Sequence, residues 1–462
     1  MTTGSVRSKL LLLAWPVMLS HLLQTLYNLA DAFWLGKLGR QALTAPTITM
    51  HVVFVGFALA MGLGAAGTTL VSQFKGAGRE EAATRVGGQL LVLLSGIALL
   101  LGILGFFLTP HIMGLLRTPA DSWQMTYDYM RWIFAGIPFL FVFFVYQGIS
   151  TGLGDTVGPM QVNLVSVLLN VILDPVMIFG LGPIPAMGVV GAAAATVFCR
   201  AVASVIGAVR LFRGRNGFRI TVADMKPDFG IMKKILRIGL PVGLGQMGTS
   251  LGFTTMIGIV NSFGSAVTAA FGVGNRIIHM AMVPAMGLSQ ANATAVGQNL
   301  GAGDERRAVR SVRDSLWLIG TILLPITSAM FFFGGDIARA FVNDPAVIEL
   351  GRTMFRITTP SVFVFGFLHV ILGSFQGSGH TLPVMVLNLS RLWVLRVPGA
   401  YLLAFLVGLN ATGIWWAMFI SNTVTAIWGL LWFRSGSWKT RARGIVGKPE
   451  RTDQVPVGTD LD

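Results

Sequence analysis

Two acidic side chains lie inside long apolar segments of the chain, where a charge has chemical consequences. Asp31 and Asp174 have this placement, whereas the other seventeen of the nineteen Asp and Glu residues fall in predicted loops, helix ends or tails. A carboxylate at membrane depth is costly, so it normally faces a bundle interior or a water-filled cavity and marks an ion or proton route. The pair therefore predicts an ion-coupled carrier.

Each carboxylate continues a polar stripe on its segment, with residues spaced by three, four or seven positions on one helical face. The members are Gln24, Tyr27, Asn28 and Asp31 in the first stripe, and Asn163, Asn170 and Asp174 in the second. If both segments run outward, helical rise places both carboxylates in the outer half of the membrane, so we expect them to meet. Two carboxylates in one site repel each other, which favours protonation of one of them in an ordinary pH range.

A proline accompanies each carboxylate. Pro175 follows Asp174 directly, and Pro16 lies near the start of the segment that carries Asp31. Proline removes a helix hydrogen bond, so we expect free carbonyls and a hinge at each position. A plainer structural interpretation stays open, in which Asp31 pairs with Lys37 at a helix end. In the same interpretation, Asp174 caps a helix that is broken at the proline.

The elements that must position these residues are membrane helices. The chain has 462 residues, of which 53% are hydrophobic and 11% charged, whereas soluble domains carry about 25% charged residues. Twelve apolar stretches are long enough to span a bilayer, without the alternation of barrel strands. They cover approximately residues 10–34, 42–72, 86–109, 127–151, 159–181, 187–212, 232–259, 266–296, 311–334, 353–376, 384–407 and 412–433. An all-α polytopic fold of twelve transmembrane helices is therefore predicted.

The net charge of +15 does not indicate nucleic-acid binding, because the basic residues cluster between apolar stretches as orientation signals do. They are enriched between the second and third, sixth and seventh, and eighth and ninth stretches, and in the C-terminal tail. This bias predicts a multi-pass protein of the cell (plasma or inner) membrane with both termini in the cytoplasm. We expect a monomer in contact with the lipid bilayer.

Other chemistry is not indicated by the sequence. The single cysteine, Cys199, leaves no intramolecular disulfide. A Ser/His/Asp set, a His cluster and an HExxH string are all missing from the sequence, which argues against a membrane-embedded enzyme. We therefore expect no cofactor other than a coupling ion.

An internal duplication organises the chain. The strings AMGLGAAGTTLVSQFKGAGREEAATR (60–85) and AMGLSQANATAVGQNLGAGDERRAVR (285–310) are identical at 14 of 26 positions, with an offset of 225 residues. The same offset relates Pro16 to Pro241 and Asn163 to Asn388. Six helices per unit give both halves one orientation, with a pseudo-two-fold axis along the membrane normal. We predict an N-lobe (1–212), a cytoplasmic linker (213–231), a C-lobe (232–435) and a disordered cytoplasmic tail (436–462).

The duplication sharpens the interpretation of the carboxylates. The 225-residue offset relates Asp31 to Met256 and Asp174 to Gly399, so the acidic pair exists in only one half. Folding of a duplicated scaffold does not by itself require such an asymmetry. A function that uses one lobe explains it better.

The ordered motifs resemble those of the multidrug and toxic compound extrusion (MATE) family. They are WPVMLSHLLQTLYNLADAFWLGKLG at the first helix, NVILDPVMIFGLGPIPAMGVVGAAAAT at residues 170–196, and the paired QFKGAG and QNLGAG loops. The resemblance covers about residues 7–435. It implies two six-helix bundles around a central cavity that opens alternately to either side, and an antiporter that exports organic cations and other amphiphiles against Na⁺ or H⁺.

The resemblance also implies where the coupling ion binds. The NorM-like branch of the family uses acidic residues in the C-terminal half, but here no Asp or Glu occurs between Asp228 and Asp304 or between Glu349 and Glu450. The chain is more similar to the DinF-like branch, whose coupling site is in the N-lobe. The residues that this similarity carries over are Asp31, Asn170, Asp174 and Thr196, with Gln24, Tyr27 and Gln147 alongside. Asp31, Asp174 and Asn170 would then be the metal ligands if Na⁺ is the coupling ion.

A second group of residues is predicted to line a substrate path. Flexible methionines suit promiscuous apolar binding, and cations inside the membrane face a cavity or reach an interface. The candidates are Gln147, Asn163, Met256, Arg276, Met280 and Arg396. For Arg391 we expect the side chain to snorkel to the interface.

Two functions stay open from sequence. The first is an antiporter for small amphiphilic or cationic compounds, driven by H⁺ or Na⁺. The alternative is a flippase for lipid-linked oligosaccharides or lipids from the same superfamily, which predicts a more cationic cavity with Arg276, Arg391 and Arg396 essential.

Overall fold

The computed structural model describes residues 4–39, 42–183, 185–214 and 218–439, and the chain is helical there apart from short connections. The predicted all-α fold class is confirmed. Most of the predicted tail, from residue 440 onward, lies outside the described residues, as do residues 215–217 of the predicted linker.

Six long helices form the first bundle. They are α1 (Val6–Lys37), α2 (Thr44–Gly76), α3 (Glu80–Leu115), α4 (Trp123–Leu153), α5 (Val157–Phe179) and α6 (Gly188–Arg213), with the short 3₁₀ turn η1 (Ala120–Ser122) before α4. Most extend several residues beyond the predicted stretches. Hydropathy marks only the part of a helix in the hydrocarbon core, whereas the helix itself continues into the polar headgroup region.

The second bundle repeats this order after the turn η2 (Val222–Met225). Its helices are α7 (Phe229–Asn261), α8 (Ser265–Gly301), α9 (Glu305–Arg339), α10 (Pro345–Gly377), α11 (Leu382–Leu389), α12 (Val397–Tyr401) and α13 (Asn410–Arg434). The π-helical segments η3 (Ser390–Arg396) and η4 (Leu402–Leu406) join α11 and α12 into one membrane segment, Leu382–Leu406. Eleven segments of the described chain are long and apolar enough to cross a membrane, and α7 is equally long but less apolar.

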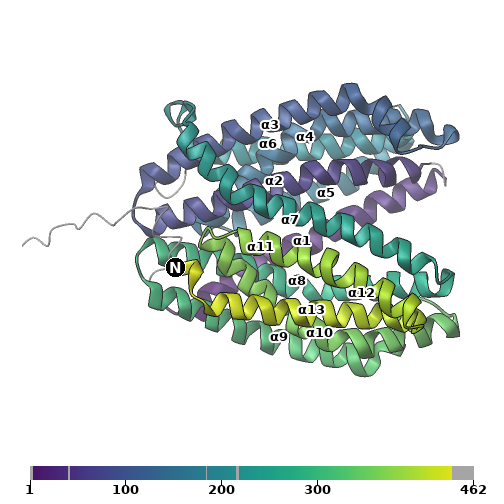
Figure 1. Cartoon of the computed structure of the whole chain (residues 1–462). Coiled ribbons are helices and arrows are strands. Elements are labelled where there is room, and N and C mark those ends of the chain that lie inside the picture. Colours follow the sequence, from purple (N-terminus) through teal and green to yellow (C-terminus); the bar gives the residue numbers. More distant parts are fainter. Residues whose placement is uncertain (1–3, 40–41, 184, 215–217, 440–462) are drawn as a thin grey trace, which may run out of the picture.

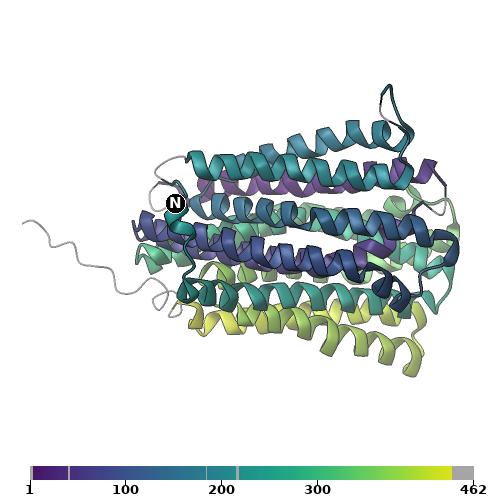
Figure 2. The same ribbon diagram turned by 90° about the horizontal axis from the view of Figure 1, so that it is seen from above.

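The long helices run along one common axis, as the two perpendicular views show (Figures 1 and 2). Figure 1 shows α2–α6 on one side and α8–α13 on the other, with α1 and α7 between them. One helix of each bundle packs against the other bundle. Helix α1 packs on α8 as well as on α5, and α7 packs on α2. Accordingly, Leu10 and Leu13 of α1 join the hydrophobic core of the second bundle, and Ile235 and Ile238 of α7 join that of the first.

Glycines allow the closest approach of the two bundles. A Cβ on Gly62 of α2 would lie 2.4 Å from the backbone nitrogen of Gly243 of α7. The pseudo-symmetric contact joins Gly287 of α8 to Met18 of α1, where a Cβ would lie 2.5 Å from the methionine side chain. Any larger residue would separate the helices, so α1 and α7 are firmly seated on the opposite lobe.

The prolines that were expected to break helices lie within continuous ones. Helix α1 runs from Val6 to Lys37 through Pro16, and α5 runs from Val157 to Phe179 through Pro175. The hydroxyl of Ser20 donates to the Pro16 carbonyl over 2.8 Å, whereas the carbonyl that Pro16 leaves without its helical N–H donor is that of Leu12. Hinge motion at either proline stays a prediction.

Candidate ion-coupling site

The structure brings the two membrane carboxylates together. Helix α1 packs along α5, and the carboxyl groups of Asp31 and Asp174 lie within hydrogen-bonding reach of each other. Asp174 is fully buried and Asp31 is half-buried. Ionised carboxylates only accept hydrogen bonds, so a bond between these two requires a proton on one of them. Neither residue sits at a helix end in the described chain, which removes the plainer interpretation of Asp31 paired with Lys37.

Asn170 lies one helical turn before Asp174 and orients it. Its amide Nδ2 donates to Asp174 Oδ1 over 2.8 Å, and its side chain is fully buried. The other carboxylate oxygen of Asp174 and the amide oxygen of Asn170 find no hydrogen-bond partner among the described residues. The pair therefore presents two unoccupied acceptor atoms to the interior.

Three further oxygens extend the cluster across α1 and α6. Tyr27 interacts electrostatically with Asp31, and its hydroxyl lies against that of Thr196. Within the described ranges, Tyr27 Oη, Asp31 Oδ1 and Thr196 Oγ1 make no hydrogen bond of normal geometry. Buried polar atoms without partners each cost free energy, and native proteins contain few of them. Five unsatisfied oxygens in one place fit a site that is completed by water, a proton or a hard cation.

We call the set Tyr27, Asp31, Asn170, Asp174 and Thr196 the oxygen cluster. Two neighbours of this cluster were missed from sequence. Arg200 lies one turn after Thr196 on α6 and interacts electrostatically with Asp31, although it forms no ion pair in the part of the chain that is described. Tyr129 of α4 is buried beside both carboxylates. The four-residue spacing from Thr196 to Arg200 was the available signal, because it places both on one face of α6.

Other predicted site residues lie elsewhere. Gln24 is about two helical turns from Asp31, is exposed, and donates to Asn28 over 3.2 Å. Asn163 donates to the Ser20 carbonyl over 3.3 Å and so joins α5 to α1. Gln147 lies half-buried in α4. Gln24 and Asn163 are about two and three helical turns from Asp31 and Asp174, respectively, so their side chains lie outside the oxygen cluster.

The predicted substrate residues of the second bundle divide into two groups. Met256 is buried in an apolar core with Phe271 and Trp415. Met280 is 50% exposed on α8, and Arg276 is exposed on the same helix. Arg396 is buried, and so is Arg391, whose side chain contacts Asn422 and the ring of Phe365. The prediction that Arg391 snorkels to an interface is wrong, because the π-helical segment η3 turns it into the bundle.

A symmetric set of hydrogen bonds joins the bundles at the end where α2, α4, α8 and α10 finish. Gln73 Nε2 donates to the Gly377 carbonyl over 2.9 Å. Gln298 Nε2 donates to the Gly152 carbonyl over 2.9 Å. Because the 225-residue offset relates Gln73 to Gln298 and Gly152 to Gly377, these two bonds are one contact repeated by the pseudo-two-fold axis.

Two threonines repeat the pattern one turn away. Thr69 Oγ1 donates to the Gln376 carbonyl over 2.8 Å, and its counterpart Thr294 Oγ1 donates to the Thr151 carbonyl over 3.2 Å. We call Thr69, Gln73, Thr294 and Gln298 the clasp, and the end of the molecule that holds them the clasp end. All four side chains are buried, so the clasp closes the lobes against each other at this end.

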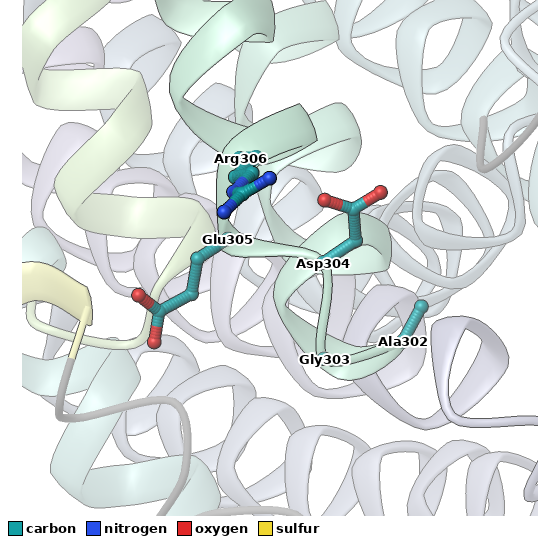
Figure 3. A pocket seen from close by; sticks show the side chains of 5 residues that line it. All are labelled: Ala302, Gly303, Asp304, Glu305 and Arg306. Carbon is teal, nitrogen blue, oxygen red and sulfur yellow. The ribbon is translucent and has the colours of Figure 1, made fainter.

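A surface depression near the clasp end has a simpler role. It lies at the turn between α8 and α9 and is lined by Ala302, Gly303, Asp304, Glu305 and Arg306 (Figure 3). Asp304 caps α9, because its carboxylate accepts a hydrogen bond from the Arg307 backbone nitrogen over 2.8 Å. We therefore assign these charged side chains to the helix start and not to ligand binding.

A two-lobed bundle of membrane helices, with unsatisfied oxygens inside one lobe and a clasp between the lobes, defines a polytopic membrane transporter. The MatE family model matches residues 16–176 and 241–402, and the two matches begin 225 residues apart. The chain belongs to this family. Its members are transporters and not enzymes.

Known proteins support this membership. The probable multidrug resistance protein YpnP of Bacillus subtilis (strain 168) is 29% identical over 440 residues, covering 95% of this chain and 97% of that protein. A FAD transporter of Shewanella oneidensis is 27% identical, covering 87% and 88%. A solved structure described as the outward-facing conformation of a multidrug resistance MATE family transporter of the MOP superfamily matches with a TM-score of 0.86 at 27% identity, covering 96% and 97%.

Proposed function

We propose that the protein is a secondary antiporter that exports amphiphilic or cationic organic compounds in exchange for an ion bound in the oxygen cluster. The observation that carries this proposal is the contact of Asp31 with Asp174, surrounded by buried oxygens that lack partners. The second lobe has no such carboxylate, since the offset relates these two positions to Met256 and Gly399. Family membership and a relative named as a multidrug resistance protein support export as the activity.

The coupling ion is, in this proposal, a proton. A proton on one member stabilises a carboxyl pair within hydrogen-bonding reach, so the contact suits one exchangeable proton. The oxygens of Asp31, Asp174 and Asn170 also suit Na⁺, which prefers hard ligands. A site of only two carboxylates and neutral oxygens fits either ion by donor type, and the contact between the carboxyl groups favours the proton.

Helix α1 transmits the state of this site to the lobe interface. Its second half carries Tyr27 and Asp31 against α5, whereas its first half packs on α8, where Met18 meets Gly287. Loss of the proton leaves two repelling carboxylates and changes the packing of α1 on α5. Because the same helix is seated on the opposite lobe, this change biases the equilibrium between the two lobe arrangements. Coupling then needs only differential affinity of substrate and ion for these arrangements.

We place the clasp end in the cytoplasm. The connections α2–α3, α8–α9 and the linker before α7 carry clustered basic residues and lie at this end. Both described chain ends, in α1 and after α13, lie at the same end (Figure 1). A closed clasp therefore corresponds to an arrangement that is shut toward the cytoplasm in a plasma or inner membrane.

The test is efflux of a fluorescent cation, rhodamine B ethyl ester, from reconstituted vesicles with the pH and Na⁺ gradients imposed separately. A proton gradient should drive efflux by the wild type, and Asp31→Asn or Asp174→Asn should abolish it. Asp128→Asn, at a half-buried position of α4 outside the oxygen cluster, is the matched control and should transport normally. Equal transport by the two site variants would refute the coupling site. If neither gradient moves the cation but labelled lipid crosses the membrane, the flippase replaces the antiporter.

A further inference from the structure

The second bundle contains two buried arginines that the coupling site does not use. Arg391 is 8% exposed and Arg396 is 5% exposed, and both lie in the π-helical segment η3. Residues five apart point in different directions on an α-helix, but the wider π-turn brings them to nearly the same face. The two guanidinium groups therefore lie together among side chains of η3, α10 and α13, a buried polar region that we call the arginine compartment.

The partners of both arginines are neutral. Arg396 Nε donates to Ser421 Oγ over 2.9 Å, and another of its nitrogens donates to Asn422 Oδ1. Arg391 donates to the same Asn422 oxygen over 3.5 Å and lies 4.5 Å from the centre of the Phe365 ring.

The two arginines therefore carry N–H donors that their neighbours leave unused. Neither arginine forms an ion pair with any described residue, and Arg391 Nε has no hydrogen-bond partner within the described ranges. Two buried cations without an anion are unfavourable, because removal from water is not offset by an opposite charge. A planar guanidinium with unused N–H groups is well suited to bind a carboxylate or phosphate in a forked geometry.

The pseudo-symmetry relates the surroundings of the two arginines to the oxygen cluster. Ser421, which binds Arg396, is the counterpart of Thr196 in the oxygen cluster, and Gly399 is the counterpart of Asp174. A Cβ on Gly399 would meet only the Ala417 side chain, at an ordinary contact distance of 3.6 Å. The position that holds a carboxylate in one lobe is thus without a side chain in the other, one helical turn from Arg396.

We propose that Arg391 and Arg396 form a binding site for the anionic group, a carboxylate or a phosphate, of a transported amphiphile. The inference rests on the proposed export function and specifies its substrates as compounds that carry an oxyanion, including zwitterions. The arginines, Ser421 and Asn422 hold the oxyanion, and the ring of Phe365 packs against Arg391.

Equilibrium binding to the purified full-length protein in lipid-free detergent tests this site without any ion gradient. The probes are rhodamine B, which has a free carboxylate, and its ethyl ester, which shares the fluorophore but lacks that charge. Arg391→Gln and Arg396→Gln should each weaken binding of rhodamine B by about 10- to 100-fold, because a charge-assisted hydrogen bond is lost. Binding of the ester should stay within about twofold, and Arg356→Gln, at an exposed position of α10, should change neither probe.

Asn422→Asp keeps the size of the side chain and supplies an internal anion next to both arginines. This variant should lower the affinity for rhodamine B as strongly as Arg396→Gln does, and it should leave binding of the ester unaffected. Because both arginines are retained, it tests the site even if the arginine variants misfold. Equal losses for both probes, or no loss for rhodamine B in any of these variants, would overturn the site.

The anionic group has a second possible source, a lipid headgroup. A short-chain phosphatidylglycerol should compete only weakly with rhodamine B, and vesicles containing the wild type should export rhodamine B. Strong arginine-dependent displacement by the lipid, together with absent rhodamine B export, would overturn the assignment to substrate. The coupling proposal is tested separately, by measuring gradient-driven efflux of the ester.

Discussion

The two lobes contain buried polar regions of opposite character at related positions, and we call both of them compartments. In the first lobe, α1, α5 and α6 gather two carboxyl groups and three neutral oxygens. In the second, η3 and α13 gather two arginines, a serine and an asparagine. Thr196 and Ser421 are related by the duplication, and Thr196 lies against Tyr27 of the oxygen cluster whereas Ser421 accepts a hydrogen bond from Arg396. One scaffold therefore supports two chemistries, because the duplicated helices carry different side chains at these related positions.

The clasp shows the opposite outcome of the same duplication. Its four hydrogen bonds use identical residue types in both lobes and bind equivalent carbonyls. A closing contact between two equal halves works best when each half contributes the same surface. The compartments instead perform different tasks, so symmetry is retained at the clasp end and lost in the compartments.

The largest effect is expected at the oxygen cluster. Asp174→Asn should lower proton-driven efflux by roughly 100-fold, because replacing an ion-site ligand removes the exchangeable charge. The isosteric amide retains the packing, so detergent-solubilised protein should unfold at nearly the same temperature. The reverse result, active efflux with a lowered unfolding temperature, would make Asp174 a structural residue and erase the contrast between the lobes.

The glycines of the clasp end should give the next largest effect. A Cβ at Gly76 would lie 1.9 Å from the Gln298 carbonyl oxygen, and a Cβ at Gly301 would lie 2.0 Å from the Gln73 carbonyl oxygen. Gly76→Ala and Gly301→Ala should therefore each destabilise the closed arrangement by about 1–3 kcal/mol. Hydrogen–deuterium exchange should rise at the ends of α2 and α8 in both variants. Gly258→Ala is the control, because a Cβ at this position has open space. If the amides of all three variants exchange as slowly as those of the wild type, the result would argue against the clasp.

The glutamines test the symmetry of the clasp directly. Gln73→Ala and Gln298→Ala each remove one buried hydrogen bond, for a loss of about 1 kcal/mol. The same exchange experiment should show equal deprotection in the two single variants and a larger effect in the double variant. A marked difference between Gln73→Ala and Gln298→Ala would show that the two lobes do not share the closure equally.

The smallest effect is expected from the paired hydroxyls. Thr196→Val should reduce proton-driven efflux of the ester by a few-fold, since one neutral oxygen of five is lost. Ser421→Ala should leave that efflux unchanged and weaken rhodamine B binding by a few-fold. If both variants reduced efflux of the ester and binding of rhodamine B equally, the result would contradict separate compartments for the ion and for the anionic group.

Much of the fold was predictable from sequence, because apolar length and the 225-residue offset reflect constraints on every residue of a membrane bundle. The meeting of Asp31 and Asp174 followed from helical rise and orientation. Contacts that depend on lobe docking were not predictable. The pairing of Gln73 with Gln298 under the offset was visible, but the carbonyls that they bind belong to helices far away in sequence.

The arginines show a different limit. Arg391 was expected at an interface because snorkelling lowers the cost of a cation inside the membrane, and the π-helical turn that brings it beside Arg396 was not predicted. Arg200 was overlooked among the membrane cations, although it follows Thr196 by one turn. Backbone irregularities and cross-helix neighbours decide such side-chain positions, and both arise only from the packed bundle.

Proton release upon substrate binding tests the central claim most directly. Rhodamine B ethyl ester is added to purified protein in weakly buffered detergent solution, and the pH change is followed with an indicator dye. The account predicts that the wild type releases protons on binding and that the Asp31→Asn/Asp174→Asn double variant binds without release. Undiminished release by the double variant would contradict a proton held between the two carboxyl groups, and so would the absence of release from wild-type protein that binds the ester.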